Sequence, residues 1–237
     1  MTGPRLAAPV ATARNEFSQA LPSQAPPPQA AVGRPAEPMS VELRRRTREA
    51  HVMVERSFAL DAWLKDRTTY ASLLVVLRAF YRPVEAALGE LEGWGRLTPP
   101  LDVGARRRAG LLDDDLDRLG VEIPALESGM GSAPELGEWL GALGSLSRGL
   151  GCLYVLEGSA LGGQIVARRA RTAIDRGLPV SFFAAADRSD LHGDWRALKA
   201  AADGYRLEHG PGAGEEMVEA ARATFSILGG WLERSRL

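Results

Sequence analysis

The chain has 237 residues, of which 45% are hydrophobic and 25% are charged, and its formal net charge at pH 7 is −1. This balance is typical of an ordinary globular protein with about one domain, and it lacks the basic excess of nucleic-acid-binding proteins. The single cysteine, Cys152, excludes a disulfide framework and any metal site that needs two thiolates. No segment approaches the roughly 18 uninterrupted apolar residues of a membrane span, so we expect no such span and a cytoplasmic location.

Residues 1–38 are rich in Ala, Pro and Gln, as in "LPSQAPPPQAAVGRPAEP", and show neither helical nor strand periodicity. Such a segment has too few large apolar side chains to offset the entropy lost on ordering. We therefore expect a disordered tail over 1–38 and a folded domain over 39–237. Two alternatives stay open for the tail: an organelle-type transit peptide, because acidic residues are scarce, and translation that begins at Met39.

From Met39 onwards the apolar spacing is helical throughout, and no segment sustains the alternation of a half-buried strand. We expect Ser40 to cap the first helix and Pro83 to kink or break the second. The segment "GSLSRGLG" is expected to interrupt the helices before residue 153. The expected helices cover residues 40–60, 68–91, 105–119, 134–143, 153–174, 189–202 and 214–234. The sequence thus predicts an all-α, single-domain, multi-helical bundle.

His51 lies on the apolar face of the first helix, which Leu43, Val54 and Phe58 outline. A neutral imidazole in an apolar wall can serve as an axial ligand of haem iron. Glu55 follows one turn later and could accept the second ring N–H, while Arg44, two turns earlier, could pair with a carboxylate of the bound molecule. The alternative is that His51 is an ordinary boundary residue and that Arg44 belongs to a solvated "RRR" face. Helical spacing alone leaves both interpretations open.

The segment "LYVLEGSALGGQIVARR" at residues 153–169 reads as a helix although it contains three glycines, each of which costs about 1 kcal/mol relative to alanine in a helix interior. Gly158 and Gly162 stand four residues apart and share one face. Such a strip has two uses: close packing of a second helix, or a bare backbone surface against which a flat ring can lie. The sequence alone does not choose between them.

Two segments together resemble the haem oxygenase family. The segment "LRRRTREAHVMVE" (43–55) is similar to the first helix of these proteins, with its Thr, proximal His and following acid, and "LYVLEGSALGGQ" (153–164) is similar to their glycine-rich distal helix. The separation of about 110 residues agrees, and residues 70–88 and 219–233 are similar to the second and last helices. The "LYVLEGSxLGG" form looks most like the bacterial, biliverdin-producing type associated with bacteriophytochromes.

The resemblance implies roles for individual residues. His51 would be the proximal ligand of the iron, and Gly158 and Gly162 would be the distal glycines that touch haem. Arg44 stands where the family often has a basic partner for a propionate, and Phe225 where an aromatic side chain lines the pocket. A second propionate partner is usual in the family, but the sequence does not place it securely.

The resemblance also implies the reaction: haem is opened to biliverdin with release of CO and ferrous iron. The reaction uses O2 and electrons from an external donor such as a ferredoxin or a reductase, and a bacteriophytochrome is a candidate recipient of the product. Ser159 departs from the best-known members, which have an Asp here that orders the distal water. A hydroxyl can still hydrogen-bond water at this catalytic position, but it is not a carboxylate.

Two other functions stay open from the sequence. The first is a non-enzymatic haem carrier or sensor on the same scaffold, which Ser159 would favour if it leaves activation defective. The second is the thiaminase-like branch of the fold, which uses a catalytic cysteine. Cys152 would be the only nucleophile for it, although the surrounding "GCLYVL" reads as core packing.

Overall fold

Helices form most of the part of the chain that the computed structural model describes, which is residues 37–121, 134–185 and 189–235. Within these ranges there is no β-strand, so the all-α prediction is confirmed. The predicted tail, apart from its last two residues, lies outside the described residues. The helices are α1 (Met39–Phe58), α2 (Leu60–Trp63), α3 (Arg67–Glu90), the 3₁₀ helix η1 (Trp94–Arg96), α4 (Ala109–Leu119), α6 (Pro134–Ala142), α7 (Leu146–Ala173), α8 (Ser181–Ala184) and α9 (Leu191–Arg234).

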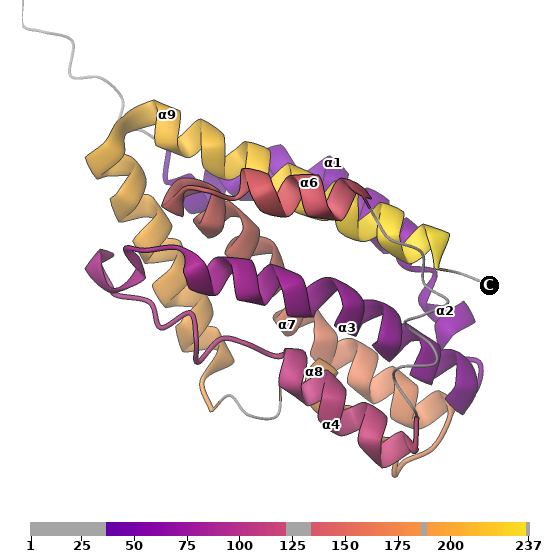
Figure 1. The fold of residues 1–237 in the computed structure, drawn as a ribbon. Helices are drawn as coiled ribbons and strands as arrows, with labels where there is room; N and C mark the ends of the chain where they lie inside the picture. The colour runs from indigo at the N-terminus through magenta and orange to yellow at the C-terminus, as the bar shows by residue number, and fades with distance from the viewer. Residues whose placement is uncertain (1–36, 122–133, 186–188, 236–237) are drawn as a thin grey trace, which may run out of the picture. The chain divides into compact units, whose positions relative to one another are not determined.

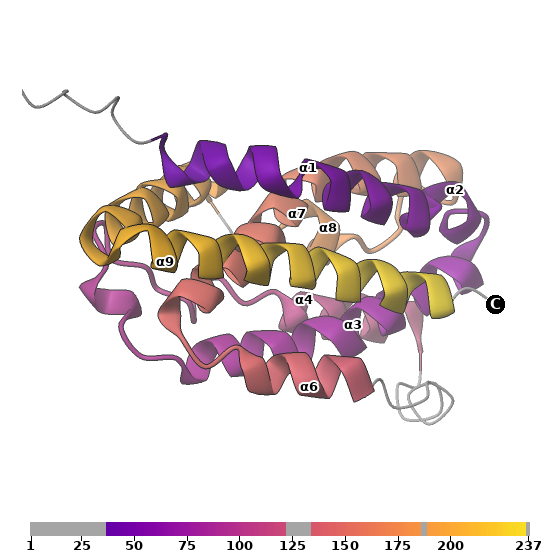
Figure 2. The ribbon, with the colours of Figure 1, turned by 90° about the horizontal axis from the view of Figure 1, so that it is seen from above.

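The last helix, α9, is the element on which α1 and α7 are both packed. These two interfaces are the most extensive in the fold, whereas α1 and α7 share no extensive interface with each other. Figures 1 and 2 show α1 running beside the C-terminal half of α9, and α6 contacts both α9 and α3. On the other side of the domain, α8 packs against both α4 and α7. The fold therefore keeps α1 and α7 apart by fixing both to one long helix.

The ends of several helices follow local capping chemistry, although not always where the sequence suggests. Asp66 caps α3 and forms a reciprocal capping box with Thr69. The prediction that Ser40 caps the first helix is wrong, because α1 already begins at Met39. Ser40 instead donates hydrogen bonds from its backbone N–H and its hydroxyl to Asp203 of α9, at 2.8 and 3.2 Å. The residue ties α1 to its neighbour.

Two predicted interruptions differ in the structure. The interruption at "GSLSRGLG" is shorter than predicted, because α6 ends at Ala142 but Ser145 already caps α7, which runs without a break from Leu146 to Ala173. Pro83 does not break α3, which is continuous from Arg67 to Glu90. The two last predicted helices form one element, α9, which changes direction at Gly210, where φ is 82°, immediately before Pro211. Buried residues on both sides of each interruption hold these helices in place.

The predicted helix over 105–119 begins four residues late because a side chain from α3 caps it. Both carboxylate oxygens of Glu85 accept backbone hydrogen bonds, from Arg108 at 2.9 Å and from Ala109 at 3.0 Å. These N–H groups are among the donors that a helix start leaves unpaired. A long-range contact thus fixes where α4 begins, and a local spacing rule does not detect it.

Helix α7 is the one helix among the described residues that is long and apolar enough to cross a membrane. However, 61% of its most apolar window is buried inside the fold. Core helices of globular domains show the same combination. The absence of a membrane span therefore stays a prediction.

One buried carboxylate anchors the short helix α8, which the sequence pattern does not predict. Asp115 of α4 is fully buried, and its two oxygens accept the backbone N–H groups of Ser181 and Phe182, each at 2.9 Å. Both N–H groups belong to the first turn of α8, and the N–H groups of a first turn have no carbonyl acceptor within their own helix. This contact joins α4 to the chain that follows α7.

We predict that Asp115→Ala lowers the free energy of unfolding by about 2–3 kcal/mol, because it leaves two N–H groups without their acceptor. The matched control is Asp114→Ala, which removes an exposed carboxylate one residue earlier and should change stability by less than about 0.5 kcal/mol. Chemical denaturation of both variants measures the difference. Equal stabilities would contradict the anchoring role of Asp115.

Candidate functional site

His51 projects from the middle of α1 at the edge of its contact with α9. Its side chain is 54% exposed, so the expectation of a buried imidazole is wrong, because only one side of α1 is covered. The ring meets Phe225 of α9 edge-on, with the ring centroids 5.5 Å apart. Its Nδ1 lies 3.7 Å from Oε1 of Glu55, within ion-pair distance but too far for a hydrogen bond. Among the described residues no group hydrogen-bonds the imidazole, which leaves its nitrogens available to a ligand.

The three consecutive arginines at 44–46 of α1 have different surroundings. Arg45 pairs with Glu37, and Arg46 pairs with Glu215 of α9. Arg44 has no carboxylate within 4 Å among the described residues. Its charge acts instead on Tyr154 of α7, opposing the rise in the tyrosine pKa that burial causes. Within the described part of the chain, Arg44 is therefore a cation without a carboxylate partner, and its charge acts on Tyr154 of α7.

Phe225, which the sequence predicts to line the pocket, lies where α9 contacts both of the other helices. It is 7% exposed and packs against His51 of α1. Its neighbour Thr224 is fully buried and hydrogen-bonds the thiol of Cys152 on α7. One turn of α9 thus places the candidate ligand on one side and the middle of α7 on the other.

The thiol of Cys152 is unsuited to nucleophilic catalysis. It is fully buried, and burial raises its pKa to about 12, with the hydrogen bond to Thr224 opposing that rise. A reactive cysteine needs a partly exposed, electropositive setting that favours the thiolate. The environment of Cys152 therefore does not support a thiaminase-like activity.

The glycines of α7 fall into two groups according to what surrounds them. A Cβ at Gly151 would collide with the carbonyl oxygen of Met217 on α9, and one at Gly163 would lie 2.6 Å from the carbonyl oxygen of Phe183. These two glycines allow close helix packing. By contrast, a Cβ at Gly162 would meet nothing within 4 Å, and one at Gly158 would only touch Trp195 at 3.9 Å.

The open backbone at Gly158 and Gly162 is bordered by aromatic side chains. Trp195 of α9 lies against Tyr154, with the ring centroids 5.0 Å apart, and Lys199 lies over the indole ring at 5.7 Å. Close packing against another described helix therefore does not explain these two glycines. A smooth backbone beside aromatic rings suits a flat, mostly apolar ligand.

Ser159, expected to act on distal water, is bonded to the protein interior. Its hydroxyl lies 2.7 Å from the Tyr81 hydroxyl, 3.0 Å from a guanidinium nitrogen of Arg108 and 2.6 Å from the Leu156 carbonyl oxygen. Neither Tyr81 nor Arg108 was predicted from the sequence. Arg108 is one of three consecutive arginines, and a run of this kind ordinarily marks a solvated surface, so only the tertiary structure shows that it is buried.

The described residues contain no group of three or more metal-ligating side chains. A metal ion held by the protein alone is therefore not supported there, whereas a metal that brings its own ring needs only one imidazole from the protein. The available ring of His51, the unpaired Arg44 and the open glycine backbone on α7 fit a planar metal-containing ligand with acidic groups.

Comparisons with known proteins point to one family. Residues 37–234 match the sequence profile of the family described as heme oxygenase. The fold is similar to heme oxygenase 2 from Chlamydomonas reinhardtii without heme (TM-score 0.70, 22% identity, 85% of this chain and 99% of that chain). It is also similar to the heme oxygenase from Leptospira interrogans (TM-score 0.64, 19% identity, 84% of this chain and 100% of that chain). A third similar structure is heme oxygenase-1 from the cyanobacterium Synechocystis in complex with heme (TM-score 0.60, 16% identity, 84% of this chain and 92% of that chain). No curated protein sequence matches the chain.

The two groups of glycines predict opposite effects on the protein without ligand. Gly151→Ala should lower the free energy of unfolding by about 1–3 kcal/mol, because the new methyl group forces α7 and α9 apart. Gly162→Ala should raise it by about 0.5–1 kcal/mol, because alanine is a better helix former and has room there. Thermal and chemical denaturation measure both. A destabilised Gly162→Ala variant would show that this glycine is needed for packing after all.

Proposed function

This chain belongs to the haem oxygenase family, and on that basis we propose that it opens haem to biliverdin with release of CO and ferrous iron. O2 and electrons from an external ferredoxin or reductase are the co-reactants of the proposal. The observation that carries it is the combination of an available imidazole on α1 with a bare glycine backbone on α7, both fixed to α9.

In this proposal His51 is the one protein ligand of the iron. The ring nitrogen Nε2 is the better donor, because Nδ1 faces Glu55 at 3.7 Å. Glu55 would favour the tautomer that keeps the proton on Nδ1. Phe225, edge-on to the imidazole, limits the rotation of the ring and so holds its lone pair in one direction.

The propionates of haem need cations that are not already neutralised by the protein. Arg44 fits, since no carboxylate among the described residues lies within 4 Å of it. Lys199 is a second candidate, because its ammonium group lies over the face of Trp195 and not beside a carboxylate. Arg196 is less suitable, because it faces Asp190 at 4.0 Å. Arg44 and Lys199 would orient the ring by ion pairs at its acidic edge.

Haem supplies the iron that binds O2 and the ring that is cleaved, while the chain controls access and orientation. Gly158 and Gly162 let the ring lie against the α7 backbone, where larger side chains would hold it away. In this arrangement the backbone groups of this segment would be the polar groups of α7 beside the ring, with the Ser159 hydroxyl behind them. We propose that they limit which ring edge is exposed to oxygen.

We further propose a cytoplasmic location and delivery of the product to a bacteriophytochrome. The support for both is the sequence resemblance to the bacterial, biliverdin-producing type, together with the composition of the chain. A test of the product is direct: the haem complex is mixed with ferredoxin, its reductase and NADPH. Formation of a red-absorbing bilin and of CO is the expected result.

One observation favours a second function, that of a haem carrier or sensor. The Ser159 hydroxyl is already bonded within the protein, and no carboxylate follows Gly158 in the sequence. A carrier would bind haem through His51 yet form no bilin and no CO in the same reduction assay. Haem oxygenase activity would give both products.

We predict that His51→Ala weakens haem binding and abolishes bilin formation, because the iron loses its protein ligand. The control is His192→Ala, since His192 is exposed on α9 and belongs to no part of the proposed site. Haem titration followed by the Soret band, with the reduction assay, measures both effects. An unchanged Soret spectrum and bilin yield in His51→Ala would overturn the assignment of the ligand.

We also predict that Gly162→Leu blocks haem binding, because a branched side chain would stand on the backbone surface that the ring needs. The matched control is Gly141→Leu, which changes another exposed helical glycine with no atom within 4 Å of its Cβ position. Both proteins should fold, and only Gly162→Leu should lose affinity for haem. Equal affinities would contradict the contact between the ring and Gly162.

A further inference from the structure

Behind the open glycine segment of α7 lies a buried cluster of three polar side chains from three different elements. Tyr81 comes from α3, Ser159 from α7, and Arg108 from the residue that precedes α4. The Arg108 nitrogen Nη2 lies 2.8 Å from the Leu156 carbonyl oxygen, 3.0 Å from Ser159 Oγ and 3.3 Å from the Tyr81 hydroxyl, and its two protons are shared among these three acceptors. Arg108 and Tyr81 are each only 2% exposed.

The donors and acceptors of this cluster can be assigned because a guanidinium only donates. The Ser159 hydroxyl has one proton and two lone pairs. Its proton goes to the Leu156 carbonyl, and its lone pairs accept from Arg108 and Tyr81. All its capacity is used, so Ser159 cannot bind a distal water without breaking one of these bonds. Its hydroxyl is the acceptor of a buried cation.

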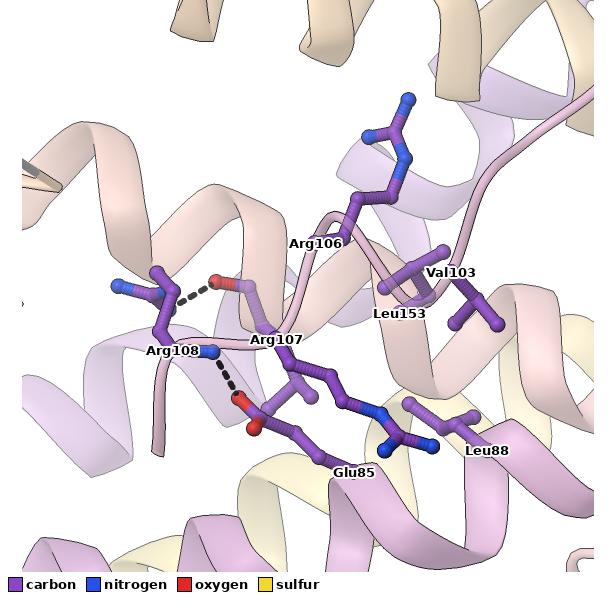
Figure 3. A pocket seen from close by; sticks show the side chains of 8 residues that line it. Glu85, Leu88, Val103, Arg106, Arg107, Arg108 and Leu153 are labelled. Carbon is purple, nitrogen blue, oxygen red and sulfur yellow. Dashed lines mark hydrogen bonds between the residues drawn. The ribbon is translucent and has the colours of Figure 1, made fainter. Parts of the chain in front are cut away.

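The three consecutive arginines 106–108, which precede α4, have different partners. Figure 3 shows the side chains of Arg106, Arg107 and Arg108 leaving the chain in three directions around a small cavity, which has room for about one water molecule. Arg106 forms a buried ion pair with Glu157 at 3.3 Å. Arg107 is exposed and its guanidinium covers Gly89.

Arg108 has no such counterion. Among the described residues no carboxylate lies within 4 Å of its guanidinium. Its partners are neutral oxygens and the faces of Tyr81 and Phe182, at 5.2 and 4.7 Å from the ring centroids. The nearby acid Glu85 accepts the backbone N–H of Arg108 and not the side chain. Burial raises the pKa of Glu85, and the charge of Arg108 opposes that rise only in part. The charge of Arg108 is therefore buried and only partly balanced.

We propose that Arg108 is a positioning residue that places a fixed positive charge behind Gly158 and Ser159, so that the α7 side of the site favours anionic ligands of the haem iron. The inference rests on the proposed function, because it assumes that haem lies against this segment. The inference concerns the charge on the α7 side of the ring. In this chain the buried cation Arg108 donates to the neutral hydroxyl of Ser159, whereas a carboxylate at position 159 would add a negative charge.

The physical reason is the low dielectric of the interior, where the field of a buried charge is weakly screened. Such a charge stabilises a negative ligand bound nearby and leaves a neutral ligand of the same site almost unaffected. The comparison of an anion with a neutral ligand therefore separates electrostatics from packing, because a loss of packing would weaken the binding of both.

The experiment uses the ferric haem complex of the full chain, titrated with azide and with imidazole at fixed pH and followed by the Soret band. Arg108→Gln removes the charge but keeps a hydrogen-bond donor, and we expect azide affinity to fall about tenfold while imidazole affinity stays within about twofold. Arg108→Lys keeps the charge and should retain most of the azide affinity. Arg107→Gln is the matched control in the same loop and should behave as the unmodified protein.

The charge of Arg108 can also be neutralised without changing Arg108 itself. Ser159→Asp places a carboxylate beside the guanidinium and should lower azide affinity to a similar extent, whereas Ser159→Asn, of the same shape without charge, should not. This pair keeps the test decisive should Arg108→Gln fail to fold.

A haem complex that depends on His51 but whose azide affinity is unchanged in Arg108→Gln and Ser159→Asp would overturn this inference alone. Parallel losses of azide and imidazole affinity would also overturn it, because they would indicate a structural role. No haem binding by the unmodified chain would overturn the proposed function together with the inference.

Discussion

The site depends on the way in which helix α9 holds two other helices without bringing them together. Gly151 lets α7 approach the backbone of α9 at Met217, and Gly229 brings α9 close to α1, since a Cβ at Gly229 would lie 3.2 Å from Cγ2 of Val54. Both contacts need a glycine because a backbone or a branched side chain lies opposite. With α1 and α7 fixed in this way, the α7 backbone at Gly158 and Gly162 themselves is not in close contact with another described helix and is open to a ligand.

This arrangement also explains why the polar groups of the site come from distant parts of the sequence. Phe225 orients the imidazole of His51, and its neighbour Thr224 bonds Cys152 on the opposite side of α9. Behind α7, the start of α4 is fixed by Glu85, and the same loop inserts Arg108 next to Ser159. Glu85, which caps α4, thus also fixes the position of Arg108, whose guanidinium hydrogen-bonds α7. The structure of the loop and the charge of the site are consequences of the same contact.

Much of the fold could be predicted from the sequence, because helical periodicity is a local property. The all-α class and the positions of most helices follow from this periodicity. It also places His51 on the first helix and the glycines on the helix that the structure shows as α7. Helix ends that depend on other elements could not be predicted. Ser40 hydrogen-bonds Asp203 of α9 instead of capping α1, and α4 begins where Glu85 of α3 accepts the backbone N–H of Arg108. The exposure of His51 was missed because spacing shows the apolar side of a helix but not how much of that side is covered.

The charged part of the candidate site was the least predictable. Three consecutive arginines at 44–46 and three more at 106–108 look alike in the sequence, yet Arg44 is exposed and Arg108 is buried. Only the packing of distant elements distinguishes them. The most direct test of the account is a crystal structure of the haem complex. It should show the iron bonded to Nε2 of His51 and the ring lying on the backbone at Gly158 and Gly162, whereas ligation by another residue, or a ring bound elsewhere, would contradict it.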